Sequence, residues 1–154
     1  MTAGARWETV LDLLAGALPD EGRLILVDGA GDRAALVADR LAGRFRAEGR
    51  TCARLTGDAC TSAADGSRAR AAGTIVIASG PRWRDHVPAG AWHLTIWVRT
   101  SPDHAGDHSD AVVDLLDPGW PVIRHLDPWL VPDEGWHRSE PRAARSVPLG
   151  GRDR

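Results

Sequence analysis

The sequence contains no lysine, because all nineteen of its lysine-plus-arginine residues are arginines. A phosphate-binding lysine, Schiff-base chemistry and a lysine general base are therefore excluded. Cysteine is also scarce: only Cys52 and Cys60 are present, at a spacing that matches neither a metal site nor a redox pair. In a chain without an export signal, two such cysteines are expected to be reduced thiols.

The chain also has little net charge and no long apolar run. Its formal charge of −2 gives no basic field, so we expect no nucleic-acid partner. No apolar stretch is long enough to cross a bilayer, and the N-terminus lacks the basic and apolar pattern of a signal peptide. We therefore expect a cytoplasmic protein without a membrane partner. At 154 residues, the chain suits one domain that can bury a real core.

What is present is organised around residues 24–49, where a strand, a glycine-containing turn and a helix follow one another. The opening LILV is a continuous apolar run, which is typical of a parallel strand covered on both faces. Gly29 and Gly31 interrupt the run, and if Gly31 adopts a positive φ, a bulky residue there should destabilise the turn. From Asp32, which can cap the free N–H groups, apolar residues recur at helical spacing until Gly49, where the helix should end.

The remaining apolar patterns alternate between those of helices and strands. A helical pattern covers about residues 5–17, and strand patterns occur at residues 51–56, 74–79, 93–98 and 111–114. Alternation of this kind predicts an α/β domain with a mostly parallel sheet of about five strands. We assign residues 1–126 to this domain.

From Asp127 onward the composition changes to proline, glycine, arginine and tryptophan. Residues 127–154 are therefore assigned to a C-terminal tail, and the last part of this tail should be disordered. Trp129 and Trp136 could anchor the tail to the domain, which is the more economical interpretation, or to a protein partner.

Two parts of the sequence resemble the uridine-kinase-like P-loop kinases. Asp28 and Gly29 end the first strand as an Asp-Gly pair does in that family, and the helix that follows is similar in pattern and length. Later, SDAVVD at residues 109–114 is followed by Asp117 and Pro118, which resembles the family's closing segment. The resemblance implies a P-loop-NTPase-like three-layer sandwich, with a nucleotide or phosphate ligand at the first strand-to-helix turn.

The resemblance assigns phosphate binding to five residues of this turn: Gly29, Ala30, Gly31, Asp32 and Arg33. The residues that carry the family's chemistry are replaced. Ala34 falls where the family has its phosphate-binding lysine, Ala35 falls where it has its magnesium-binding hydroxyl, and the turn is about two residues too short. Residues 59–73 are too few to enclose a sugar and a base, and the arginine-bearing lid of the family is missing.

Asp58 matches the aspartate that the family carries at the end of its second strand, near the nucleoside hydroxyl. A carboxylate there could accept the proton of that hydroxyl. The same residue could instead cap the turn that follows the strand, because aspartate is common at strand ends. ATP and Mg²⁺ are implied as cofactors only if the chain is an active kinase.

Two further polar segments each have two interpretations. The basic stretch 82–86 could contact an anion, although a solvated connection is favoured. His104 and His108 have the spacing of two metal ligands on one helical face. Gly106 weakens that helix, so a polar loop is favoured and no metal site is predicted.

These observations favour a degenerate, shortened uridine-kinase-like protein that keeps the scaffold and weak nucleotide or phosphate binding, without efficient phosphoryl transfer. One alternative is an active nucleoside-type phosphotransferase that uses Arg33 at the helix N-terminus and Asp58 as the base. Another is a small accessory protein that binds a partner through its tryptophan-containing tail.

Overall fold

A computed structural model of the chain describes residues 1–18, 23–29, 31–56, 73–80, 83–86, 91–102 and 109–130. The helices are α1 (Ala3–Gly16), α2 (Gly31–Ala47), the short α4 (Trp83–His86) and the 3-10 helix η2 (Pro128–Leu130). The strands are β1 (Leu24–Gly29), β2 (Cys52–Leu55), β3 (Ile75–Ser79), β4 (Leu94–Arg99), β5 (Ala111–Asp114) and β6 (Val122–Leu126).

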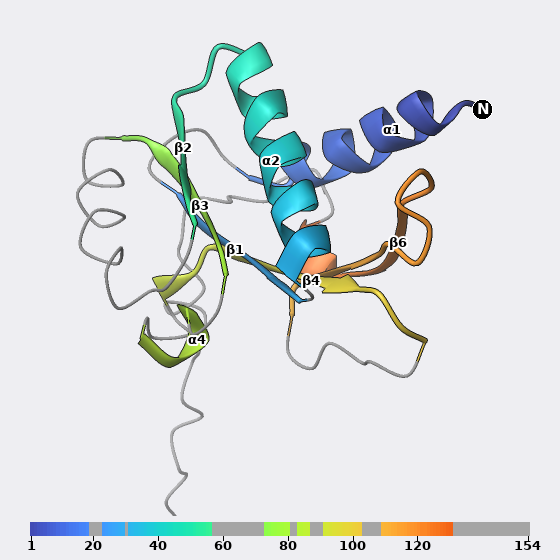
Figure 1. Cartoon of the computed structure of the whole chain (residues 1–154). Coiled ribbons are helices and arrows are strands. Elements are labelled where there is room, and N and C mark those ends of the chain that lie inside the picture. Colours follow the sequence, from blue (N-terminus) through green and yellow to red (C-terminus); the bar gives the residue numbers. More distant parts are fainter. Residues whose placement is uncertain are drawn as a thin grey trace, which may run out of the picture.

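The six strands form one sheet in the order β2-β3-β1-β4-β5-β6 (Figure 1). The central strand β1 pairs in parallel with β3 on one side and with β4 on the other, and β2 and β5 extend the sheet in the same direction. Among the strands of the described residues, only β6 is antiparallel. The predicted α/β class and mostly parallel sheet are confirmed, with one strand more than the five expected. The finer P-loop-type, three-layer architecture stays a prediction.

Alternate residues of the central strand face opposite sides of the sheet. Ile25 and Val27 belong to the larger core cluster, which lies beneath α1 and α2. Leu26 belongs to the smaller cluster on the other face, together with Trp83 and Trp92. Both long helices therefore cover one face, and α4 lies on the opposite side of the sheet (Figure 1). Burial on both faces explains why the opening run LILV has no polar alternation.

The first helix forms close to where its apolar spacing predicts it. Its buried side chains include Trp7, Val10 and Leu14, which recur at the spacing of one helical face. Trp7 Nε1 also donates a hydrogen bond to the carbonyl of Pro118 at 3.0 Å. This bond ties α1 to the connection between β5 and β6.

The second helix ends at the glycine where the sequence predicts its end. Gly49 has a φ of 79°, and its N–H donates to the carbonyl of Arg46 at 3.0 Å. The N–H of Arg50 donates to the carbonyl of Phe45 at 2.9 Å. These two bonds form a Schellman motif, which satisfies carbonyls that the helix leaves without partners. The guanidinium of Arg50 also lies 4.7 Å from the centre of the Phe45 ring.

The positive φ in the first turn is found at Gly29 rather than at Gly31. Gly29 has a φ of 129°, and a β-carbon built there would lie 2.4 Å from the carbonyl oxygen of Val98. Gly31 is instead the first residue of α2, and a β-carbon there would have no neighbour within 4 Å. The condition for a destabilising substitution at Gly31 is therefore not met, so that expectation does not apply to this chain.

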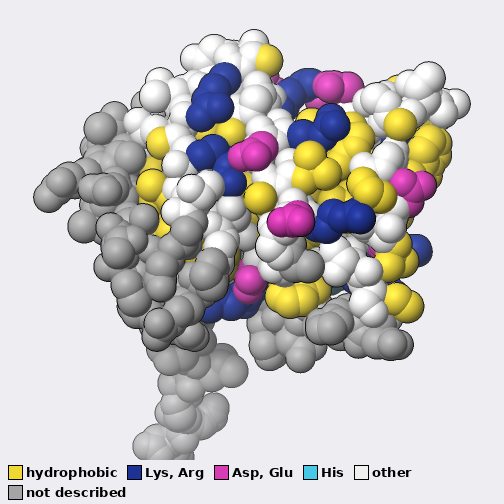
Figure 2. Space-filling model, viewed as in Figure 1, with side chains coloured by type: hydrophobic (Ala, Val, Ile, Leu, Met, Phe, Trp, Pro, Cys, Tyr) yellow, Lys and Arg dark blue, Asp and Glu magenta, His cyan; other side chains and the backbone are white. Residues whose placement is uncertain are grey.

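Basic and acidic side chains are interspersed on the face shown in Figure 2. Arg44 of α2 illustrates how they are used. Its guanidinium lies 2.8 Å from the carboxylate of Glu8 in α1 and 3.0 Å from that of Glu48, and it also contacts Asp12. This arginine therefore joins the two long helices, although ion pairs at an exposed surface stabilise a fold only modestly.

Several predictions concern residues that lie outside the described ranges. These are Asp58, Ala30, most of residues 59–73, the pair His104 and His108, and the tail from residue 131. Across the described part of the chain, no helix combines the length and the apolar character needed to cross a membrane.

Candidate functional site

The candidate site lies where β1 passes into α2. β1 ends at Gly29 and α2 begins at Gly31, so only Ala30 separates the strand from the helix. The first N–H groups of a helix have no partners within the helix, and they carry a partial positive charge. Open α/β sheets bind ligands outside the carboxyl ends of their strands, which is where this turn lies.

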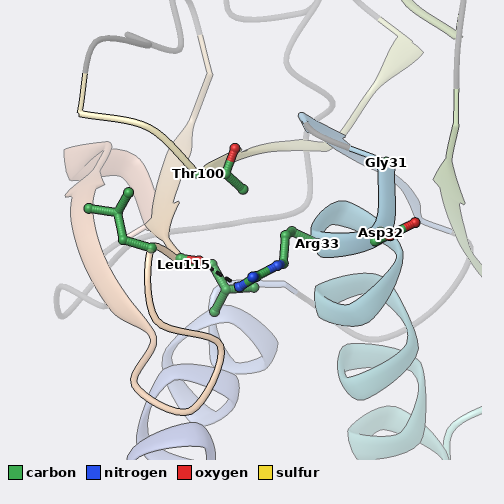
Figure 3. Close-up of a pocket in the computed structure, with 6 residues that line it drawn as sticks. Gly31, Asp32, Arg33, Thr100 and Leu115 are labelled. Atoms are coloured by element: carbon green, nitrogen blue, oxygen red, sulfur yellow. Dashed lines mark hydrogen bonds between the residues drawn. The ribbon is translucent and has the colours of Figure 1, made fainter.

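A pocket of about 440 Å³ lies beside the N-terminus of α2 (Figure 3). Its lining comes from the start of α2, from the end of β4 and from the residues after β5: Gly31, Asp32, Arg33, Thr100, Leu115 and Leu116. The volume is within the range of small-molecule pockets. Three of the five predicted turn residues therefore line one pocket. Gly29 lies in the strand just before it, and Ala30 falls outside the described residues.

Arg33 is the one cation among the six lining residues. Its side chain reaches across to the residues after β5, and Nη1 donates a hydrogen bond to the carbonyl of Leu115 at 3.0 Å (Figure 3). A guanidinium has five N–H donors in a fixed plane. One bond to a carbonyl therefore orients Arg33 and leaves other donors for an anion.

Asp32 is the one carboxylate of the lining. It is exposed in the first turn of α2, and its side chain points away from Arg33 (Figure 3). The helix dipole stabilises a negative charge at this position, but that charge repels a second anion. The two charged side chains of the pocket are therefore separated rather than paired with each other.

Asp28, the other carboxylate near the turn, is held in an ion pair. Its Oδ2 lies 2.5 Å from Nε of Arg84 in α4, and its Oδ1 accepts a hydrogen bond from the N–H of Gly29 at 2.9 Å. Nη2 of Arg84 also donates to Oγ of Ser109 at 3.0 Å. Arg84, an exposed residue of the stretch 82–86, therefore has two specific partners, Asp28 and Ser109.

Asp114, at the end of β5, fixes the wall of the pocket that Leu115 and Leu116 form. Its side chain is 5% exposed, and it accepts hydrogen bonds at 3.1 Å from Nε of Arg124 and from the N–H of Leu116. Nη1 of Arg99 lies 3.9 Å away. Burial acts to raise the pKa of Asp114, but these hydrogen bonds and the two guanidiniums outweigh it and lower the pKa below its ordinary value.

The residues at the positions that bind magnesium and ATP in the kinase family do not fit those groups. Ala34 is 3% exposed and belongs to the core, and Ala35 offers no hydroxyl at the position of a magnesium ligand. Within the described ranges, no group of three His, Cys, Asp or Glu residues could hold a metal ion.

Three lining residues, Thr100, Leu115 and Leu116, are not among the residues that the sequence assigns to the site. Thr100 follows the fourth strand. The carboxyl ends of parallel strands share one edge of the sheet, so the position of Thr100 just after a strand could have predicted that it lies near the site. Leu115 takes part through its carbonyl group. A backbone group leaves no signal in the sequence.

The arrangement can hold a small anion. The N-terminus of α2 and the guanidinium of Arg33 supply donors, and Thr100 lines the same pocket. Comparison of the chain with protein-family models, with curated proteins and with solved structures found no match.

Proposed function

We propose that this chain is a shortened, degenerate uridine-kinase-like protein that binds phosphate-bearing ligands weakly and does not transfer phosphoryl groups efficiently. In this proposal the P-loop-type scaffold persists as an α/β domain, and the pocket beside α2 is the remnant of a phosphate site. The proposal places Gly31, Asp32 and Arg33 at the ligand, with Gly29 and Ala30 shaping the turn.

One observation carries the proposal: the N-terminus of α2 and an arginine that the fold holds in position line the same pocket. Helix N-termini favour negative charge, and a guanidinium can grip two oxygens of one phosphate. The pocket also lies at the carboxyl edge of a mostly parallel sheet, where α/β proteins bind their ligands.

The absence of a phosphate-surrounding loop and of a lysine implies weak phosphate binding without phosphoryl transfer. The turn contains a single residue between β1 and α2, so it has no extended loop of N–H groups to surround a phosphate. No lysine exists in the chain to neutralise the charge that develops on a transferring phosphoryl group. Electrostatic contributions of this kind are worth about 3 to 4 kcal/mol each, so their loss should slow transfer by many powers of ten.

We expect inorganic phosphate to bind with a dissociation constant of about 1 mM or weaker, equivalent to about 4 kcal/mol. Arg33→Ala should weaken this binding about tenfold, because it removes a charged donor. Asp32→Ser should tighten it about threefold, because a neutral cap removes one repelling charge. Titration calorimetry with phosphate, ATP and GTP would measure these changes.

Arg46→Ala is a matched control for Arg33→Ala. Arg46 is exposed near the other end of α2, where it bonds to the carbonyl of Cys52 at 3.2 Å. The control removes the same charge at about 20 Å along the helix, where salt screens it, and should leave the affinity unchanged. If Arg33→Ala and Arg46→Ala have the same effect, the phosphate is not bound at this pocket.

We also expect no measurable phosphorylation of uridine or cytidine with ATP and Mg²⁺. Turnover by the wild-type chain that is lost in Asp58→Asn would instead support an active phosphotransferase. An assay of purified protein with radiolabelled ATP would distinguish the two outcomes.

A further inference from the structure

Arg84 and Asp28 form an ion pair that no part of the proposed function explains. Asp28 lies in β1 three residues before Gly31, and Arg84 reaches it from the connection between β3 and β4. Arg84 is exposed and Asp28 is partly buried, with 38% and 26% of their side chains accessible. The bond from the N–H of Gly29 fixes the carboxylate of Asp28 at the start of the turn.

The topology of the sheet brings these two residues together. β1 and β3 are neighbours and run in parallel, but α2 follows β1 on one face of the sheet and α4 follows β3 on the other. In α/β sheets, ligands bind between two neighbouring strands when the chain after one strand passes to one face of the sheet and the chain after the other strand passes to the opposite face. Arg84 is therefore a cation that the opposite face contributes at this edge of the sheet.

The charges of the turn residues themselves balance only when Arg84 is included. The turn itself carries two carboxylates, Asp28 and Asp32, and one guanidinium, Arg33. Without a second cation this set has a net negative charge, which would repel a phosphate and reduce the effect of the helix dipole. With Arg84 paired to Asp28 the set is neutral, and the helix N-terminus and Arg33 are then free to favour an anion.

We propose that Arg84 sets the anion affinity of the pocket by neutralising Asp28. This inference rests on the proposed function, because it concerns the same pocket, and it makes Arg84 a positioning residue rather than one that touches the ligand. The relevant property of Arg84 is its charge, and its second bond, to Ser109, holds that charge in place.

The test measures the affinity for inorganic phosphate in three variants. Arg84→Gln removes the charge and should weaken binding about three- to tenfold, whereas Arg84→Lys keeps the charge and should stay close to wild type. The double variant Asp28→Asn with Arg84→Gln removes both charges and should recover an affinity close to wild type. Arg46→Gln, at the far end of α2, is the control for a general loss of positive charge.

The double variant separates an electrostatic role from a structural one. If Arg84 only holds α4 in place, then Asp28→Asn cannot restore the affinity, and the inference is overturned. It is also overturned if Arg84→Gln binds phosphate as the wild-type chain does. Raising the salt concentration should reduce the difference between Arg84→Gln and wild type, whereas a loss of folding would not respond in this way. If the wild-type chain binds no phosphate at all, the proposed function itself fails, which is a different result from failure at Arg84 alone.

Discussion

Replacing Gly29 by alanine should lower the free energy of unfolding by about 3 kcal/mol or more, a larger loss than we expect for the other substitutions proposed for this chain. Two independent causes add. The φ of 129° is one that residues with a β-carbon rarely adopt, and that β-carbon would lie 2.4 Å from the carbonyl oxygen of Val98. Because Gly29 and Val98 are register partners of β1 and β4, relief of the clash would have to displace backbone in the middle of the sheet.

Gly31→Ala is the matched control, since the two glycines flank the same turn. Gly31 begins α2 with open space around it, so alanine should be neutral there or stabilise the fold by up to about 1 kcal/mol through its higher helix propensity. Chemical denaturation of both variants would measure the difference. Equal stability of the two variants would contradict the close approach of β1 and β4 at Gly29.

Asp114→Asn should have the second largest effect, a loss of about 2 kcal/mol at neutral pH. The substitution removes a charged acceptor that is 5% exposed and holds Arg124 and the N–H of Leu116. Arg124→Ala is the milder comparison. The side chain of Arg124 is 56% exposed. Its removal also leaves the Asp114 carboxylate with two partners, Arg99 and the N–H of Leu116. We therefore expect a smaller loss for Arg124→Ala than for Asp114→Asn.

The effect of Asp114 should also depend on pH in a defined direction. The pKa of Asp114 is lowered in the folded chain, so its stabilising contribution is fully present above the unfolded value of about 3.9. That contribution is lost as the pH falls through the lower, folded pKa. The stability of the wild-type chain should therefore decrease more steeply with acid than that of Asp114→Asn. If the stabilities of the wild-type chain and of Asp114→Asn decrease in parallel between about pH 5 and pH 2, the ionised carboxylate of Asp114 contributes nothing to stability.

Most of the central fold could be predicted because burial on both faces leaves a continuous apolar run. The strands β1 and β3 contain such runs, and the spacing of buried side chains in α1 and α2 is that of helices. The sixth strand was not predicted because it lacks this burial on both faces. β6 is an antiparallel edge strand with Arg124 and His125 exposed, so its sequence has neither a continuous run nor a strong alternation.

The site was predictable in its position but not in its contacts. A strand followed by a glycine turn and a helix places a helix N-terminus at the edge of a sheet, whatever the rest of the chain does. Which glycine needs a positive φ depends on the approach of Val98, a residue of another strand. The partners of Arg33 and Arg84 are likewise distant in sequence, at Leu115 and Asp28, and neither can be read from local spacing.

We infer that a phosphate binds at the N-terminus of α2, and amide NMR spectra recorded during a titration with inorganic phosphate test this binding most directly. We expect saturable shifts of the amide signals of Gly31, Asp32 and Arg33, with smaller shifts at Thr100 and Leu115, and a loss of these shifts in Arg33→Ala. Unchanged spectra would contradict the claim. So would shifts confined to other parts of the domain, such as the region around Arg46, because they would place any bound anion elsewhere.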